Sequence, residues 1–212
     1  GGAFTFVPRY RRPDPGATLV VVVSRDGREV AREQAPCRDG VPLCVAVPDP
    51  ELWYPGEPVL YDVAFVVARE GEQVDAVRSY AALREVSLRD GTFFINESSV
   101  YLRLVLDQGF YPDGVWTAPS DEALKRDIEL SMAAGFNGAR LHQKVFEDRF
   151  HYWADRLGYL TWSEWPSWGL EYNDYTAARA FENEVYFYDR SAKFDEAEWR
   201  AHLARRPAGY ER

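Results

Sequence analysis

Short apolar runs separated by turn residues fill the first 85 residues, a pattern typical of antiparallel β-structure. Residues 18–24 are apolar and β-branched, and the Asp26-Gly27 pair that follows favours a tight hairpin turn. Apolar residues alternate with period two in 59–67, so one face of that strand is predicted to be buried. The strands predicted in this way cover residues 18–24, 28–33, 41–47, 59–67 and 74–83. Their spacing predicts an antiparallel β-sandwich.

The pattern changes near residue 85, where a small hairpin (86–88 and 92–95) leads into a strand at 100–106. Ser120 is a candidate helix N-cap, and apolar residues follow it at helical spacing as far as Gly135. A strand at 136–141, a second amphipathic helix ending at Gly158 and a strand at 159–162 complete the pattern. The order βαβαβ predicts a parallel sheet with right-handed crossovers.

Two kinds of parallel sheet compete for this region. A nucleotide-binding sheet would carry a glycine-rich turn after its first strand, and residues 107–114 lack that spacing. A (β/α)₈ barrel tolerates long loops after its strands, because those loops build its active site. We therefore expect the first part of a (β/α)₈ TIM barrel.

The composition narrows the classes of function. A net charge of -9 argues against nucleic acid and against anionic membrane surfaces as partners. No run approaches the roughly 20 apolar residues of a membrane span, and residues 1–8 do not resemble a secretory signal, so we expect a cytoplasmic protein. A mature secreted form that has lost its signal stays an alternative. Cys37 and Cys44 are expected to be reduced thiols, although a hairpin at Asp39-Gly40 could bring them close enough to bridge. No zinc site is predicted.

Several motifs, in order along the chain, resemble glycoside hydrolase family 2, which includes β-galactosidases, β-glucuronidases and β-mannosidases. The motifs are LWYPGEPVLYD at 52–62, FIN at 94–96 followed by YLR at 101–103, DQGFYPDG at 107–114, APSDEAL at 118–124, FNGARLHQK at 136–144, YWADRLG at 152–158 and WSE at 162–164. One departure is Glu97, which stands where the family has a glycine and predicts a different turn type.

The resemblance implies a multidomain β and α/β protein, with an incomplete immunoglobulin-like β-sandwich at 1–85 and the N-terminal part of a TIM-barrel catalytic domain at 86–212. It implies a retaining β-glycosidase that hydrolyses terminal β-linked sugars with an acid/base carboxyl and a nucleophilic carboxylate, and no organic cofactor. The family's acid follows an Asn at the end of barrel strand four, and its nucleophile ends strand seven. Because only three barrel strands are predicted, we expect a fragment that lacks this carboxylate pair. Glu184, in Asn183-Glu184, is a candidate acid, although its helix-like surroundings favour a coincidence.

Six residues are candidates for binding the sugar: Asp107, Arg140, His142, Glu164, Trp165 and Trp168. The first four follow or end predicted strands, where barrel sites are built, and the tryptophans offer rings on which sugars stack. Structural roles remain open for the first four: a turn-forming Asp107, an Arg140 ion pair, a His142 hydrogen bond to a loop and a solvated Glu164. Trp153 and Trp162 are predicted to pack in the core, and His151 and His202 to lie on the surface.

The sequence leaves two other classes open: a non-catalytic carbohydrate-binding protein and an inactive truncated product. A homo-oligomer, or the remainder of the barrel, could complete the open sheet. Sugar specificity and the role of residues 171–212 are not predicted.

Overall fold

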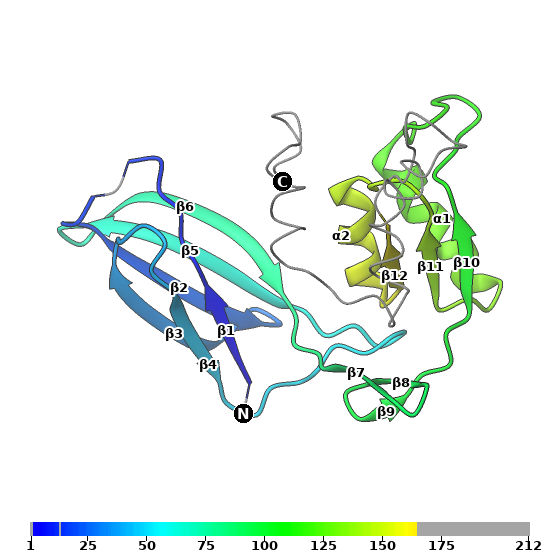
Figure 1. Ribbon diagram of the computed structural model, residues 1–212. Helices are drawn as coiled ribbons and strands as arrows, with labels where there is room; N and C mark the ends of the chain where they lie inside the picture. Colours follow the sequence, from blue (N-terminus) through cyan, green and yellow to red (C-terminus); the bar gives the residue numbers. More distant parts are fainter. Residues whose placement is uncertain (1, 13, 165–212) are drawn as a thin grey trace, which may run out of the picture.

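The computed structural model describes residues 2–12 and 14–164. A β-sandwich forms one side of this part of the chain and a three-stranded α/β unit forms the other, and a small hairpin that connects them along the chain lies at the bottom of the view (Figure 1). The arrangement follows the change of hydrophobic pattern near residue 85.

The sandwich contains a two-stranded and a four-stranded antiparallel sheet. Strands β1 (Gly2–Phe6) and β4 (Leu43–Val47) form the smaller sheet. The larger sheet has the order β3 (Arg28–Pro36), β2 (Thr18–Arg25), β5 (Tyr61–Arg69) and β6 (Glu72–Ala81). The core between the sheets includes the buried side chains of Phe4, Leu19, Val21, Val23, Val45, Val47, Tyr61 and Val63. The antiparallel strands predicted from the sequence are confirmed; β1 was not predicted.

The two-residue turns of the hairpins have the backbone conformation that their sequences favour. Asp26-Gly27, Glu70-Gly71 and Asp90-Gly91 all have positive φ at both positions, which matches the twist of the flanking strands. Asn96 and Glu97 have φ of 49° and 64°, so their turn belongs to this same class. The expectation of a different turn type was therefore wrong: Glu97 adopts the left-handed conformation that glycine would adopt without strain.

The α/β unit has three parallel strands and two helices. Strands β10 (Leu104–Asp107), β11 (Gly138–Leu141) and β12 (Leu160–Ser163) pair in that order, which confirms the predicted βαβαβ pattern. Helix α1 (Asp121–Ala133) begins as predicted, because the Ser120 hydroxyl accepts a hydrogen bond from the Ala123 N–H at 3.2 Å. Helix α2 (Asp148–Leu157) ends at Gly158, whose φ is 73°. A shared core of Leu124, Ile128, Ala139, Leu141, Phe146, Phe150, Ala154 and Tyr159 joins helices and sheet.

The loop that carries the LWYPGEP motif docks onto the end of helix α2. The fully buried Trp53 donates its indole N–H to the Asp155 carbonyl at 2.8 Å, and the Gly56 N–H donates to the Gly158 carbonyl at 2.9 Å. The Tyr80 hydroxyl, from β6, donates to the Asp155 carboxylate at 2.9 Å. This motif therefore holds the sandwich against the α/β unit.

The small hairpin of β7 (Val86–Arg89) and β8 (Thr92–Ile95) is extended by β9 (Ser98–Ser99) into a three-stranded antiparallel sheet. Asn96 fastens it to the sandwich: its amide donates to the Trp53 carbonyl at 2.8 Å and accepts from the Glu85 N–H at 2.9 Å. The FIN and LW motifs are thus joined directly, although 43 positions separate Trp53 from Asn96.

Two expectations about burial were wrong. Trp162 is 41% exposed, because it lies level with Leu106 and Arg140 on the face of the sheet opposite Ala139 and Leu141, which pack in the helix-covered core. His151 is partly buried in α2, and this burial lowers its pKa.

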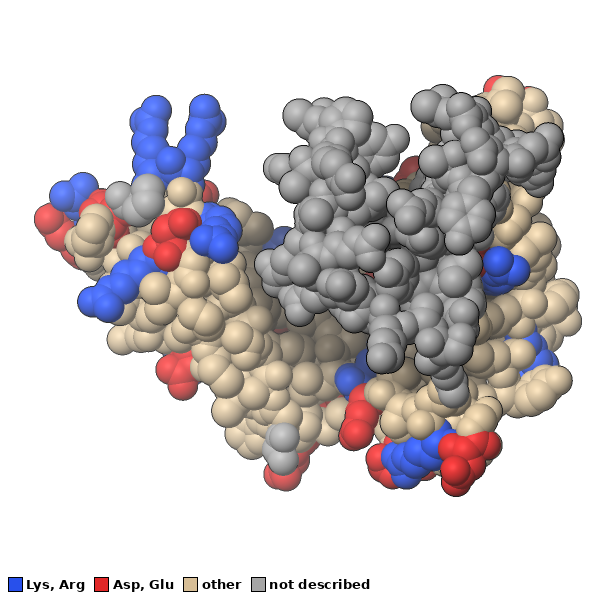
Figure 2. All heavy atoms as spheres, viewed as in Figure 1, with Lys and Arg blue, Asp and Glu red and all other residues tan. Residues whose placement is uncertain are grey.

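Both cysteines are free, Cys37 buried and Cys44 exposed. No helix among the described residues is long and apolar enough to cross a membrane. On the face that Figure 2 shows, acidic and basic side chains lie next to one another.

Candidate functional site

The carboxyl ends of the three parallel strands bring four of the candidate residues to one edge of the sheet. Asp107 ends β10, Arg140 and His142 lie at the end of β11, and Glu164 follows β12. The register pairs Asp107 with Leu141 and Leu141 with Ser163, so the three strand ends are level. The sequence therefore predicted which of the described candidates come together.

Arg140 and Glu164 form an ion pair across neighbouring strands. The Glu164 carboxylate accepts a hydrogen bond from Arg140 Nε and a second one, at 3.3 Å, from the Gln143 N–H. The Glu164 side chain is only 2% exposed, whereas that of Arg140 is 40% exposed. A buried charge is tolerated only where it is paired and hydrogen-bonded. The solvated-loop interpretation of Glu164 was therefore wrong: Glu164 orients the guanidinium of Arg140.

His142 is hydrogen-bonded to Asp107 through the backbone and to Gln108 through its side chain. The His142 N–H donates to the Asp107 carbonyl at 2.7 Å, which continues the ladder beyond the strands. The Gln108 side-chain amide lies 2.9 Å from His142 Nδ1. With Gln108 as the donor, the ring proton resides on Nε2, which is then a hydrogen-bond donor.

Asp107 stabilises the turn after β10. Its carboxylate accepts from the Gly109 N–H at 2.7 Å, the geometry of a turn-forming Asp. Burial raises the pKa of Asp107, the Gly109 hydrogen bond acts against this, and the nearby Asp127 carboxylate raises it further. A second role of Asp107, in binding a sugar hydroxyl, stays a prediction.

Lys144 is a site residue that the sequence reasoning did not single out. It is 8% exposed, and its ammonium donates to the carbonyls of Trp116 at 2.9 Å and Gly109 at 3.3 Å. The Glu147 carboxylate lies 3.6 Å away. Lys144 therefore fastens the β10–α1 loop beside the strand ends. Its place in the FNGARLHQK motif, two residues after His142, was the available signal.

Trp165, Trp168 and Glu184 lie outside the described residues, and so does His202. Their roles stay predictions. Among residues 2–12 and 14–164 no group of His, Cys, Asp and Glu side chains could hold a metal ion.

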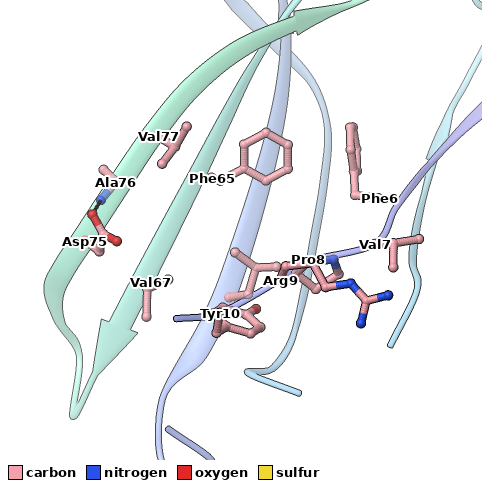
Figure 3. A pocket seen from close by; sticks show the side chains of 11 residues that line it. Phe6, Val7, Pro8, Arg9, Tyr10, Phe65, Val67, Asp75, Ala76 and Val77 are labelled. Atoms are coloured by element: carbon pink, nitrogen blue, oxygen red, sulfur yellow. Dashed lines mark hydrogen bonds between the residues drawn. The ribbon is translucent and has the colours of Figure 1, made fainter. Parts of the chain in front are cut away.

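An apolar cleft in the sandwich is separate from this cluster (Figure 3). Its lining includes Phe6, Tyr10, Phe65, Val67 and Val77, from β5, β6 and the β1 region. Phe6 and Phe65 meet edge to face, with ring centroids 5.0 Å apart. Of the described candidates, none of Asp107, Arg140, His142 and Glu164 lines the cleft.

In (β/α)₈ barrel enzymes the active site lies at the carboxyl ends of the parallel strands. The comparisons with known proteins bear on the family of this chain. Residues 13–84 match the model of the glycosyl hydrolases family 2. The resemblance to that family, stated above from the motifs, is therefore confirmed for part of the chain.

Two curated relatives extend the match. A putative β-glucuronidase of Formosa agariphila is 29% identical over 121 residues, which cover 57% of this chain and 15% of the relative. A β-galactosidase of Thermoanaerobacter pseudethanolicus is 26% identical over 158 residues, covering 72% of this chain and 21% of the relative. The chain thus spans about a fifth or less of the length of these relatives.

Solved structures show the same architecture. The FMN-binding β-glucuronidase of Facaelibacterium prausnitzii L2-6 has 29% identity and a TM-score of 0.68, and the match covers 73% of this chain and 24% of that chain. A family 2 member from Bacteroides cellulosilyticus has 25% identity and a TM-score of 0.62, covering 68% and 21%.

Proposed function

We propose that this chain is a part of a retaining β-glycosidase, and that its strand-end cluster holds the terminal β-linked sugar. The observation that carries the proposal is the convergence of Asp107, His142 and the Arg140–Glu164 pair at the carboxyl edge of β10, β11 and β12. The match to the glycosyl hydrolases family 2 supports the class of reaction.

The chemistry of the cluster suits a sugar hydroxyl or carboxylate. With Gln108 as the donor to Nδ1, His142 offers its Nε2–H as a donor, the Asp107 carboxylate is an acceptor, and the Arg140 guanidinium, held by Glu164, is a charged donor. Preorganised groups of this kind bind a sugar without first having to become ordered. In the proposed enzyme these three residues bind and orient the sugar. The acid/base and the nucleophile come from residues outside the described part, and Glu184 remains a candidate for the acid.

We also propose that the three parallel strands are the first three of a (β/α)₈ barrel. The face of the sheet that carries Leu106, Arg140 and Trp162 then becomes the barrel interior, which side chains normally fill in layers. A whole barrel takes typically about 250 residues, so further strands would come from outside the described residues.

The test is a panel of aryl β-galactosides, β-glucuronides, β-mannosides and β-glucosides, assayed for both turnover and saturable binding on the purified chain. We expect one sugar class to bind, with His142→Ala and Arg140→Lys each weakening binding by about tenfold, roughly the loss of one hydrogen bond to a charged or preorganised group. His151→Gln, in α2, is the matched control and should bind as the unmodified chain does.

Binding without turnover supports the role of the cluster in holding the sugar. It is the result expected if the catalytic carboxylates lie outside this chain, or if the protein binds carbohydrate without hydrolysing it. Turnover abolished by Glu184→Gln would assign the acid. The proposal fails if no glycoside binds, or if binding is indifferent to both site substitutions.

A further inference from the structure

Two large aromatic side chains lie exposed on the loop between β10 and α1. Phe110 is 63% exposed and Trp116 is 46% exposed. Their rings are almost parallel, with an angle of 13° between the planes and centroids 6.2 Å apart. Aromatic side chains usually gain stability by burying most of their area. An exposed pair of them is the kind of apolar surface that marks a binding site.

The loop that carries the two rings is held in one conformation. Tyr111 and Val115 exchange backbone hydrogen bonds of 2.9 Å in both directions, which closes a small turn between the rings. The Lys144 ammonium holds the loop from below, through the carbonyls of Gly109 and Trp116. Burial, followed by the nearby Asp127 carboxylate, raises the pKa of the Tyr111 hydroxyl. The rings are therefore presented by a fixed support.

The same loop connects the rings to the strand-end cluster. The Trp116 indole N–H donates to the Gln108 carbonyl at 3.2 Å, and the Gln108 side chain contacts His142 Nδ1 at 2.9 Å. Gln108 is thus hydrogen-bonded both to Trp116 and to the candidate sugar-binding histidine, so the loop that carries the rings adjoins the strand-end cluster.

We propose that Phe110 and Trp116 form the stacking surface for the ring attached to the terminal sugar, either an aryl group or a second pyranose. Both kinds of ring present a flat face to an aromatic side chain, and neither needs a charge. This inference rests on the proposed function, because it needs a terminal sugar at the strand-end cluster. It adds a subsite that recognises the leaving group.

The experiment compares matched ligands with the same sugar: the methyl, p-nitrophenyl and disaccharide β-glycosides of the class that binds best. Dissociation constants are measured by titration calorimetry on the full chain and on Phe110→Ala, Trp116→Ala and Trp116→Phe. The control is Tyr101→Ala, which removes an aromatic ring that is 81% exposed and belongs to the loop before β10. Thermal unfolding of each variant verifies that it is folded.

We expect Phe110→Ala and Trp116→Ala to raise the dissociation constant of the aryl or disaccharide glycoside by about 3- to 10-fold, the usual range for loss of one aromatic contact. The dissociation constant of the methyl glycoside should stay unchanged. Trp116→Phe keeps a ring and should retain most of the affinity. Selective loss for the p-nitrophenyl ligand or for the disaccharide tells which ring the subsite prefers.

The inference is overturned if the ratio of aryl to methyl affinity stays the same in both alanine variants, or if Tyr101→Ala lowers it equally. If the chain binds glycosides through His142 and its affinity ratios stay unchanged, only the proposal of the stacking subsite is refuted. If the chain binds no glycoside at all, the proposed function is refuted as well.

Discussion

Asn96 links the sandwich, the small hairpin and the buried Trp53 loop, so its replacement by alanine tests how the two parts of the chain are joined. The substitution removes the hydrogen bonds to the Trp53 carbonyl and from the Glu85 N–H. Each is worth about 1 kcal/mol. Alanine has the same Cβ as asparagine but lacks the short polar side chain that helps asparagine adopt a positive φ, so the Asn96 φ of 49° adds a further cost below about 1 kcal/mol. We therefore expect a loss of about 2–3 kcal/mol in the free energy of unfolding.

The assay is equilibrium urea unfolding, followed by circular dichroism and by tryptophan fluorescence. Asn96→Gly is the matched control: it loses the same side-chain hydrogen bonds but keeps a backbone that accepts positive φ. It should therefore be more stable than Asn96→Ala by about 1 kcal/mol. A loss below about 0.5 kcal/mol for Asn96→Ala, where surface substitutions usually fall, would refute the claim that these hydrogen bonds join the two parts.

Three further predictions follow from the same structure. Lys144→Met leaves the carbonyls of Gly109 and Trp116 without their donor and should lower the free energy of unfolding in urea by about 1–3 kcal/mol. The control Lys125→Met, on the partly exposed face of α1, should lower it far less. Equal decreases in the two variants would contradict the role of Lys144. Glu97→Gly should raise the melting temperature by about 2–4 °C, because glycine accepts the φ of 64° without strain. The substitution also removes the exposed ion pair with Arg89, which contributes little to stability. A lower melting temperature would show that the ion pair outweighs the strain. Burial lowers the pKa of His151 in the folded chain. As the pH falls below the unfolded pKa of about 6.5, the unfolded chain therefore takes up a proton before the folded chain does, and the free energy of unfolding decreases. Between about pH 7 and 5.5 this decrease should be smaller in His151→Gln, and identical pH profiles would rule the effect out.

The elements that the sequence predicted are those whose signals are local. The Asp-Gly and Glu-Gly turns need positive φ at two successive positions, and Ser120 caps α1 through its own hydroxyl, so neighbouring residues were enough. Strand β1 was missed because its burial depends on pairing with β4, roughly 40 residues away in the register that joins Phe4 to Val45. A single strand of five residues carries little periodicity of its own.

The sequence predicted the position of the candidate site better than the hydrogen bonds and burial of its side chains. Parallel strands end on one edge of their sheet, so the motif residues Asp107, His142 and Glu164 were expected to meet there. The burial of Glu164 beneath Arg140 and the two carbonyls bound by Lys144 depend on how loops fold back over the strand ends. No spacing in the sequence encodes those contacts.

Two of the motifs that carry the family resemblance have a structural role. LWYPGEP and FIN contact each other and the end of α2, through Trp53, Asn96 and Asp155. They explain how the domains are joined, and they contribute no side chain to the strand-end cluster.

The most direct test of the central proposal is histidine NMR during a glycoside titration. The chain has 3 histidines, and the His142 signals are assigned by their loss in His142→Gln. The account predicts that the aryl β-glycoside that binds best shifts the His142 ring signals in a saturable manner, with Nε2 protonated, and leaves those of His151 unchanged. Saturable binding that leaves His142 unaffected, or that shifts His151 instead, would contradict the assignment of the sugar to the ends of β10, β11 and β12.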